Sequence, residues 1–206
     1  MARWTPQKKD VLDALAGEIL HNYGKGRTIV AVDGIDGSGR KPFADDLAAA
    51  ISRAGHSVFR ASMGAFHKPR ADRYARGVDS GEGYYHDSFN YSVFRRVLID
   101  PFRMGGSTGF VTEAFDVARD AVIESNWQTA PKDAMLIVDG AFLNRPDLRG
   151  LWNYSIWLEV PKTAAKARLE ELNGPDGLSK RYPDGQKLYE KEAKPSTAAS
   201  AIVDNV

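Results

Sequence analysis

The sequence has no cysteine among its 206 residues, which excludes disulfide bonds and metal sites built from thiolates. It also has no apolar run approaching the ~20 residues that a membrane-spanning helix needs. Charge of one sign is not in excess, because 28 Lys and Arg stand against 27 Asp and Glu. No overall field therefore attracts the chain to nucleic acid or to an anionic membrane. We expect a cytoplasmic protein with neither of these partners, and its oligomeric state stays open.

What is present is an ordinary globular composition, with 43% hydrophobic and 27% charged residues, in a length that suits one domain over residues 1–206. Short apolar or β-branched runs predict strands at 28–33, 57–62, 134–140, 154–160 and 201–206. Helical patterns lie between them. This alternation predicts an α/β fold: a doubly wound, mostly parallel sheet of about five strands with helices on both faces.

Two polar stretches interrupt the alternation. Residues 64–133 are rich in Gly, Tyr, Asp and Arg, and they predict a substrate-side insertion over the carboxyl edge of the sheet. Residues 173–192 predict a small, mobile, lid-like flap before the last strand. Neither stretch is expected to fold as a separate domain.

The stretch "GIDGSGRKPF" follows the first predicted strand and precedes a predicted helix, which is the setting of a phosphate-binding loop. Backbone N–H groups in such a loop converge on an anion, and the helix dipole adds to the attraction. The other phosphate motif, G-x-G-x-x-G, fails because its frame ends at Pro42. The residues expected to bind the nucleotide phosphates are Gly34, Asp36, Gly37, Ser38, Gly39, Arg40 and Lys41.

The end of this loop departs from the usual Gly-Lys-Ser or Gly-Lys-Thr. Arg40 keeps the charge of the lysine but has a broader, planar head. Lys41 replaces the hydroxyl that coordinates Mg²⁺, and it is a cation where a cation should bind. Pro42 removes an N–H group from the first turn of the helix. We expect anion binding with weak or absent Mg²⁺.

The chain as a whole resembles the uridine kinase-like family of P-loop NTPases, in its short bacterial form. The stretches that carry the resemblance are "RTIVAVDGIDGSG", "RASMGAFHKPRADRYARG", "DSFNYSVFRRVLIDPF", "IVDGAFLNRPDLRGLW", "LEVPKTAAKARL", "KRYPDGQKLY" and "AIVDN". The resemblance implies that ATP is the phosphate donor and that the acceptor is the 5′-hydroxyl of a nucleoside or a similar small alcohol.

The resemblance also implies roles for the residues expected to be catalytic. Asp139 matches the acid that orients Mg²⁺, and the alternative is a cap on the following helix. Arg181 in the flap matches the lid arginine that neutralises the transferring phosphate, and Arg168 is expected to help it. A solvated surface arginine is the alternative for both. Arg40 completes the phosphate side of the site.

The position of the general base is altered. Where the family has an aspartate in a pattern like Asp-Gly-Phe-His, this chain has Gly64-Ala65-Phe66-His67, and glycine accepts no proton. His67 titrates near neutrality and is the candidate substitute. It lies three residues further on, so a pocket-lining or structural role is favoured.

The remaining candidates lie in the insertion. Arg70, Arg73 and Arg76 are three apart, which predicts one side of a short helix facing an anion, or else a solvated basic face. The aromatic residues nearby are expected to stack on a base or simply to pack. The residues expected to contact the substrate are Phe66, His67, Arg73, Tyr74, Arg76, Phe115 and Asp116.

Three functional hypotheses follow. The first is an ATP-dependent phosphotransferase of uridine kinase-like type whose activity is weak or lost, because the loop lysine, the metal hydroxyl and the base are all replaced. The second is a non-catalytic protein that binds a nucleotide or a phosphorylated metabolite. The third is a thymidylate kinase-like enzyme, since phosphate loops in that family often read Gly-Ile-Asp-Gly-Ser-Gly and Asp72-Arg73-Tyr74 also occurs there. The triplet there ends an apolar strand, whereas "HKPRA" precedes it here.

Overall fold

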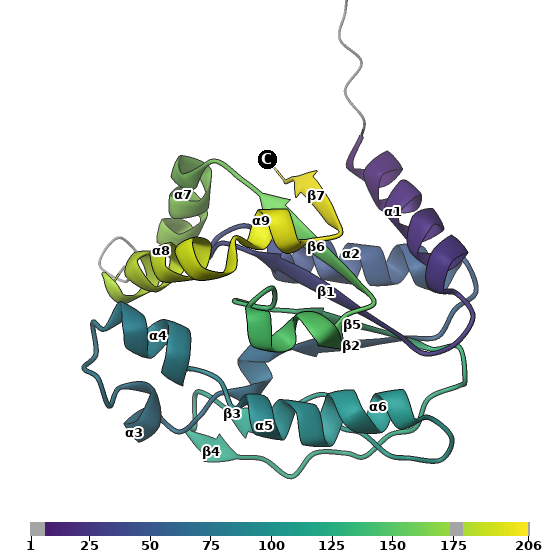
Figure 1. Ribbon diagram of the computed structural model, residues 1–206, viewed down its shortest axis with the longest axis horizontal. Helices are drawn as coiled ribbons and strands as arrows, with labels where there is room; N and C mark the ends of the chain where they lie inside the picture. The colour runs from purple at the N-terminus through teal and green to yellow at the C-terminus, as the bar shows by residue number, and fades with distance from the viewer. Residues whose placement is uncertain (1–6, 174–178, 206) are drawn as a thin grey trace, which may run out of the picture.

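A five-stranded parallel sheet forms the centre of the molecule, in the order β2-β5-β1-β6-β7 (Figure 1). The computed structural model describes residues 7–173 and 179–205. The strands are β1 (Thr28–Gly34), β2 (Val58–Ser62), β5 (Met135–Asp139), β6 (Tyr154–Glu159) and β7 (Ala201–Asp204). This confirms the predicted five-stranded, parallel α/β architecture, with strand bounds that differ from the expected ones by one or two residues.

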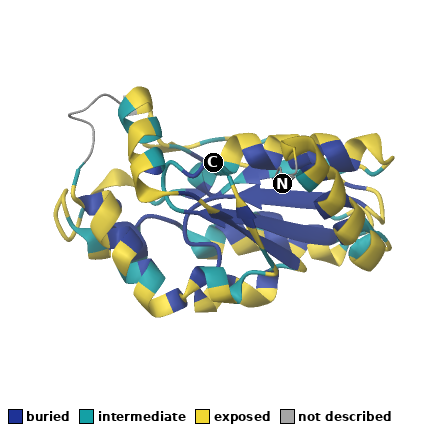
Figure 2. Ribbon diagram, turned by 90° about the horizontal axis from the view of Figure 1, so that it is seen from above, coloured by how far each residue is buried: buried dark blue, intermediate teal, exposed yellow. Residues whose placement is uncertain are grey.

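Strands β1 and β5 are buried along their whole length, as their continuous apolar sequence predicts. Alternate residues of β1 point to opposite faces of the sheet. Val30 and Val32 pack with the helices α1 (Lys8–Tyr23) and α2 (Arg40–Arg53) on one face. Ile29 and Ala31 belong to the core of the other face. The sheet is therefore doubly wound, and Figure 2 shows its buried strands between helices whose outer surfaces are exposed.

The second face is covered by the insertion and by the C-terminal helices. The elements of the insertion are η1 (Met63–Phe66), α3 (Arg70–Arg73), α4 (Gly81–Asp87), α5 (Tyr91–Phe94), the π-helical turn η2 (Arg95–Ile99), α6 (Asp100–Met104) and the small hairpin β3 (Phe115–Asp116) and β4 (Ala121–Val122). Aromatic side chains join them to the sheet, among them Phe94, Phe102 and Phe110, which have no exposed surface.

The chain after β5 forms η3 (Pro146–Leu151), β6, α7 (Lys162–Asn173), α8 (Arg181–Ala193) and α9 (Pro195–Ala198) before β7. Residues 174–178 of the expected flap lie outside the described residues. The greater part of that stretch is the regular helix α8, which packs against α4 of the insertion (Figure 1). Helix α8 therefore joins the two polar segments over the carboxyl edge of the sheet.

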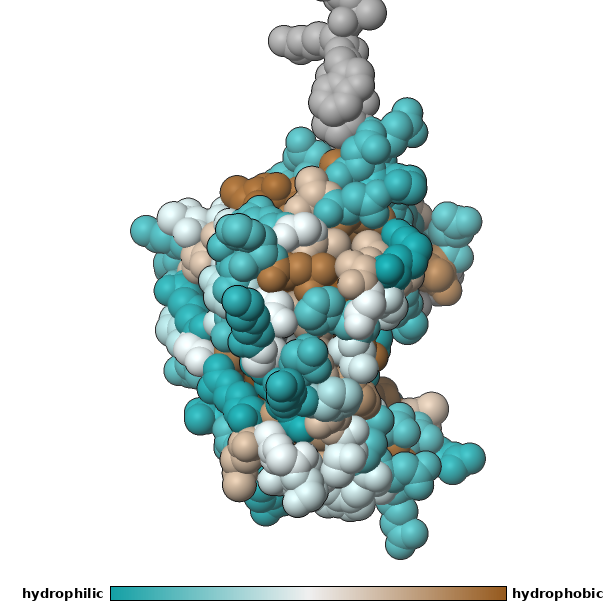
Figure 3. Space-filling view, turned by 90° about the vertical axis from the view of Figure 1, so that its right-hand side faces the viewer, coloured by the Kyte–Doolittle hydropathy of each residue, from teal (hydrophilic) through white to brown (hydrophobic). Residues whose placement is uncertain are grey.

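None of the helices in the described ranges is long and apolar enough to cross a membrane. Figure 3 views the molecule from the side on which α1 lies, and apolar residues appear there as separate spots within a mostly hydrophilic surface. Isolated apolar residues of this kind are normal on a protein surface.

Candidate functional site

The candidate site lies at the carboxyl edge of the sheet, where β1, β2 and β5 end side by side. Asp139, the last residue of β5, is in register with Ser62 of β2 and Val32 of β1. The phosphate-binding loop leaves β1 at Gly34 and enters α2 at Arg40. This is the edge at which open parallel sheets bind their ligands.

Glycines give the loop its shape. Gly37 and Gly39 have positive φ angles of 82° and 81°, which residues with a Cβ rarely adopt. A Cβ on Gly37 would also lie 2.2 Å from the Ala165 carbonyl oxygen of α7. Around the loop, Asn205 Nδ2 donates to the Ser38 carbonyl at 2.7 Å, and Arg168 Nη1 donates to the Gly37 carbonyl at 3.3 Å. The predicted helper Arg168 thus holds the loop backbone.

The amide groups of this loop suit an anion. Across the part of the chain that the structure describes, the N–H groups of Asp36, Gly37, Gly39 and Arg40 donate to no backbone acceptor. The first N–H groups of a helix are also without helical partners, and the helix dipole makes that end positive. The residues present therefore fit the phosphates of a nucleotide such as ATP.

The charged groups of the loop pair with each other. Arg40 Nη2 lies 2.8 Å from Asp36 Oδ1, and its Nη1 donates to the Gly34 carbonyl at 2.5 Å. Burial by itself would lower the pKa of Arg40, but the charge of Asp36 raises it overall, so the guanidinium stays charged. Arg40 therefore contacts the loop at both Gly34 and Asp36, and its positive charge neutralises the carboxylate of Asp36.

Asp36 is held from two further elements. Tyr84 of α4 donates its hydroxyl to Asp36 Oδ2 at 2.8 Å, and Gln186 Nε2 of α8 donates to the same oxygen at 3.3 Å. A cavity of about 390 Å³ adjoins this point, between the loop, α7 and α8. The loop, the insertion and α8 thus meet at one side chain.

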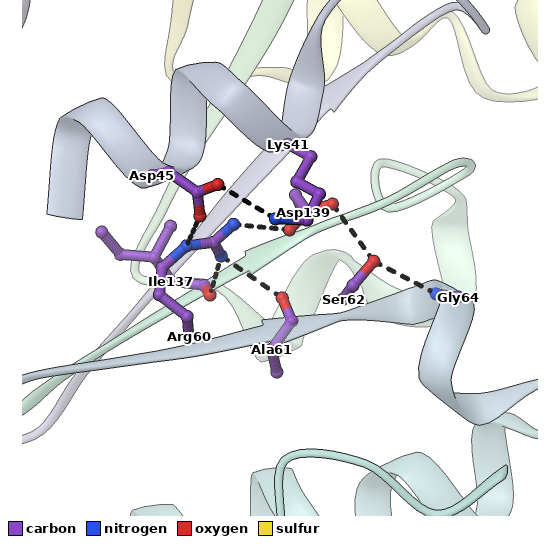
Figure 4. A network of polar contacts seen from close by, with 8 residues as sticks. All are labelled: Lys41, Asp45, Arg60, Ala61, Ser62, Gly64, Ile137 and Asp139. Atoms are coloured by element: carbon purple, nitrogen blue, oxygen red, sulfur yellow. Dashed lines mark hydrogen bonds and ion pairs between the residues drawn. The ribbon is translucent and has the colours of Figure 1, made fainter. Parts of the chain in front are cut away.

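The expected metal position is taken up by ion pairs (Figure 4). Asp139 Oδ1 lies 2.6 Å from Arg60 Nη2, and its Oδ2 accepts a hydrogen bond from Ser62 Oγ at 3.1 Å. Arg60 also pairs with Asp45 of α2 at 3.0 Å, and Asp45 pairs with Lys41 at 3.1 Å. Within residues 7–173 and 179–205, no group of three or more His, Cys, Asp or Glu could hold a metal ion. This donor set does not fit Mg²⁺, which prefers several oxygen ligands in octahedral geometry.

The base position carries no acid, and His67 lies beside it. His67 Nδ1 is 2.7 Å from the Gly64 carbonyl oxygen. Because a carbonyl only accepts, Nδ1 carries the proton and Nε2 keeps its lone pair. Burial lowers the pKa of His67, and the charges of Arg73 and Arg181 lower it further, although the bond to Gly64 opposes this. Burial therefore favours the neutral form of His67.

A second cavity, of about 680 Å³, lies on the insertion side of His67. Of the predicted substrate residues, Phe66, His67 and Phe115 line it, together with Trp127 and Arg96. Asp116 instead accepts hydrogen bonds from the backbone of Ala118 and Arg119, and so shapes its own turn. The insertion therefore encloses a largely apolar cavity next to the altered base position.

The arginines of the insertion do not share one side of a helix, which corrects that expectation. Helix α3 ends at Arg73, too short to include Arg76. Arg73 is buried and pairs with Asp120 at 3.2 Å, whereas Arg76 is half-exposed and pairs with Asp87 at 2.7 Å. Nearby carboxylates thus draw the two guanidinium groups apart.

Arg181, the predicted lid arginine, is 3% exposed and points to the insertion. Its Nη2 donates to the Arg73 carbonyl at 2.8 Å and its Nη1 to the Ser80 carbonyl at 3.3 Å. Its guanidinium also lies 4.7 Å from the ring centre of Tyr74. Burial lowers the pKa of Arg181. In this arrangement Arg181 fastens α8 to α3 and α4.

Several residues of the site were not among the predicted ones, including Asp45, Ser62 and Gln186. Two others are charged residues at strand positions. One is Arg60, described above. The other is Asp33, which has no exposed surface and accepts hydrogen bonds from Tyr189 of α8 and from the amide and side chain of Asn144. Burial raises the pKa of Asp33, and the bond from Tyr189 limits the rise. The position of Asp33 at the end of an apolar run could have marked it as a site residue. No local pattern in the sequence could have marked Arg60 in this way.

Comparison with known proteins identifies the fold. No protein-family model matches the chain, and no curated protein matches it. A solved structure of a possible uridine kinase from Bacillus stearothermophilus aligns with a TM-score of 0.77 at 22% identity, over 95% of this chain and 98% of that one. The chain has the fold of the uridine kinase-like P-loop kinases. The fold that the resemblance predicted is thereby confirmed.

Other P-loop kinase-like structures align over nearly the same length. A candidate fructose transport system kinase from Silicibacter sp. TM1040 is 25% identical, with a TM-score of 0.69 over 93% of this chain and 98% of that one. D-glycerate 3-kinase from Cryptococcus neoformans is 9% identical, with a TM-score of 0.56 over 95% and 89% of the two chains. Since the names of these proteins include different acceptors, the fold alone does not select one.

Proposed function

We propose that the chain binds a nucleotide, ATP above all, through the loop from Gly34 to Gly39. We further propose that it transfers phosphate to a nucleoside or a similar small alcohol very slowly or not at all. The anion-binding part of the site supports the first statement. Among the described residues, the N–H groups of Asp36, Gly37, Gly39 and Arg40 have no backbone acceptor, and α2 begins directly behind them.

One observation carries the second statement: the charged groups at the catalytic end already have protein partners. Arg40 pairs with Asp36, Lys41 with Asp45, and Asp139 with Arg60. Phosphoryl transfer depends on positioned charges that neutralise the transferring group. Charges engaged within the protein must leave their partners before they can act on a ligand, so the barrier to transfer stays high.

The base position supports the same conclusion. A positioned general base contributes roughly 10²–10⁴ in rate, and Gly64 cannot supply one. The three changes act on one transition state, so their effects are not expected to add. A protein of this kind keeps the nucleotide site and loses most of the chemistry.

The test is calorimetry with ATP and ADP, paired with an assay of ADP formation over a panel of nucleosides and sugar alcohols in the same samples. We expect ATP to bind and ADP formation to stay far below kinase rates, which are about 1–100 per second. Arg40→Gln should weaken ATP binding. Arg53→Gln is the matched control, because Arg53 is exposed and lies at the other end of α2. Failure of ATP to bind, or turnover at ordinary kinase rates, would contradict the proposal.

A second candidate function is a working kinase that uses His67 as its base. It is favoured by the lowered pKa of His67, by the lone pair that the Nδ1 hydrogen bond leaves on Nε2, and by the position of His67 on the wall of the 680 Å³ cavity. The expected signature is a rate that falls at acidic pH as His67 becomes protonated, and that is lost in His67→Gln. His21→Gln is the control, since His21 is exposed on α1. Equal rates in His67→Gln and the parent would eliminate this candidate.

The thymidylate kinase-like alternative loses the support of the triplet. Asp72 and Arg73 end the short helix α3 and Tyr74 caps it, so the triplet does not follow a strand. Arg73 and Tyr74 contact Arg181 instead.

A further inference from the structure

The ion pairs around Asp139 form a closed set of charges between α2, β2 and β5. Asp45 and Asp139 contribute two negative charges, and Lys41 and Arg60 contribute two positive ones. The Arg60 guanidinium lies between the two carboxylates and also donates to the Ile137 carbonyl at 2.6 Å (Figure 4). The set has no net charge, so it offers no excess of negative potential to a metal cation.

The oxygens of Asp139 are also occupied. Arg60 takes Oδ1 and Ser62 takes Oδ2, and the side chain of Asp139 is only 7% exposed. In P-loop NTPases the metal is held by an acid in this position together with the hydroxyl that follows the loop lysine. Here that hydroxyl is replaced by Lys41, whose ammonium group turns to Asp45. A metal ion would have to displace Arg60 and then lie beside a second cation.

We infer that Arg60 takes the place of the metal ion, and that this site binds its phosphate ligand in the metal-free form. The expected ligand is a nucleotide or another phosphate ester without bound Mg²⁺. The inference rests on the proposed function only where it concerns the nucleotide. Its metal part concerns side chains of this chain alone. Arg40 and Lys41 directly follow the loop, and Arg168 donates to the Gly37 carbonyl, so all three are positive charges beside the loop that can serve a metal-free phosphate.

The same geometry predicts which groups would remain if the charges of Lys41 and Arg60 were removed. Asp45, Asp139 and Ser62 would remain as neighbouring oxygen groups, and a threonine at position 41 would add one more. Oxygen ligands of this type are those that Mg²⁺ and Mn²⁺ prefer. The double variant Lys41→Thr/Arg60→Gln should therefore gain a divalent metal site that the parent lacks. Glutamine at position 60 removes the charge while keeping a donor for the Ile137 carbonyl.

The experiment measures binding of Mn²⁺ alone to the nucleotide-free protein, by electron paramagnetic resonance of the free ion. We expect no binding by the parent, clear binding by Lys41→Thr/Arg60→Gln, and loss of that binding when Asp139→Asn is added. The control Lys41→Thr/Arg53→Gln removes two charges as well but leaves Arg60 in place, and it should bind no Mn²⁺. Binding by the parent that is lost in Asp139→Asn overturns the inference, and so does a folded double variant that binds no Mn²⁺.

A second measurement needs no variant, so it remains decisive if the double variant does not fold. ATP affinity of the parent is determined with Mg²⁺ and with EDTA. We expect the two dissociation constants to agree within about threefold, and a preference for MgATP of about tenfold or more overturns the inference. Failure of the proposed function gives a different result, namely no ATP binding under either condition, while the Mn²⁺ measurement still reports on Arg60.

Discussion

Arg40, the first residue of α2, pairs with Asp36 of the phosphate-binding loop, with Nη2 of the arginine 2.8 Å from Oδ1 of the aspartate. Both side chains are more than four-fifths buried. The loop therefore contains an anion of its own, placed against the residue that is expected to meet the phosphate. A ligand has to compete with Asp36 for Arg40.

Asp36→Asn should therefore strengthen the binding of anions. A competition worth about 1 kcal/mol corresponds to roughly fivefold in affinity, and we expect a gain of that order for ATP and for inorganic pyrophosphate. Calorimetry measures it directly. Asp46→Asn is the matched control, since Asp46 lies on α2 and pairs with Lys8 on the surface. A loss of affinity in Asp36→Asn would show that the carboxylate helps to bind the ligand.

Gly37→Ala should damage the loop beyond the usual effect of a positive φ angle. The added Cβ would lie 2.2 Å from the Ala165 carbonyl, so α7 and the loop would have to separate. Gly55 also has a positive φ, of 92°, but has nothing within 4 Å of its Cβ position. Backbone strain of this kind costs about 1–3 kcal/mol. We expect Gly55→Ala to show that cost alone, and Gly37→Ala to be less stable than Gly55→Ala and to lose ATP binding. Thermal unfolding and calorimetry provide the measurements, and equal behaviour of the two variants would contradict the clash.

Tyr189→Phe should destabilise the protein, and more so as the pH rises. Burial raises the pKa of Asp33 above its usual value of 3.8, so the folded state holds a proton that the unfolded state releases. The protonation of Asp33 therefore adds stability that is fully present below pH 3.8, the pKa of the unfolded state. That stability is lost as the pH rises through the higher pKa of Asp33 in the folded state. The hydroxyl of Tyr189 lowers the pKa of Asp33 and offsets part of this loss.

The expected deficit of Tyr189→Phe is about 1–3 kcal/mol, the range for a buried polar group left without its partner. It should be smaller at mildly acidic pH than at neutral pH, in urea unfolding of parent and variant. Tyr154→Phe is the control, because the Tyr154 hydroxyl bonds to Glu18, outside this network. A deficit that stays constant with pH would mean that Asp33 is not the group affected.

Restoring the catalytic groups together should raise phosphoryl transfer. Position 64 has room for a side chain, because the nearest atom to a Cβ there is Ser62 Oγ at 3.5 Å. We expect Arg40→Lys/Lys41→Thr/Gly64→Asp to form ADP faster than the parent, and addition of Arg60→Gln to raise the rate again by freeing Asp139. General-base assistance of roughly 10²–10⁴ is the largest single gain expected. The same variant with Gly64→Asn keeps the size of the side chain but not the base, and equal rates with Asn and Asp would refute a base at this position.

Local signals in the sequence were enough to predict the sheet and the loop. The buried strands β1 and β5 are continuous apolar runs, and the glycines of the loop stand directly after the first of them. The exact ends of helices and strands depend on contacts with other parts of the chain, which an apolar run alone does not reveal. Strand β7, expected from residue 201 to 206, ends at Asp204, which is paired with Glu159, the last residue of β6.

The local ion pairs Arg40–Asp36 and Lys41–Asp45 span only four residues, but other pairings of the site could not be predicted because they join residues far apart in the chain. Arg60 and Asp139 are 79 residues apart, and Tyr189 and Asp33 are 156 apart. The resemblance supplied a role for Asp139 but could not say that a strand neighbour would neutralise it. Arg76 shows the same limit, since spacing placed it with Arg73 while Asp87 holds it elsewhere.

Helix α8 touches three parts of the site through three side chains. Arg181 donates to the backbone of the insertion, Gln186 to Asp36 of the loop, and Tyr189 to Asp33 at the end of β1. By thermodynamic linkage, a ligand that favours one arrangement of Asp36 also changes the free energy of opening of α8. The backbone amides of α8 should consequently exchange their hydrogens with solvent at a rate that depends on whether the loop is occupied. Hydrogen exchange in α8 would therefore report whether a ligand occupies the phosphate-binding loop.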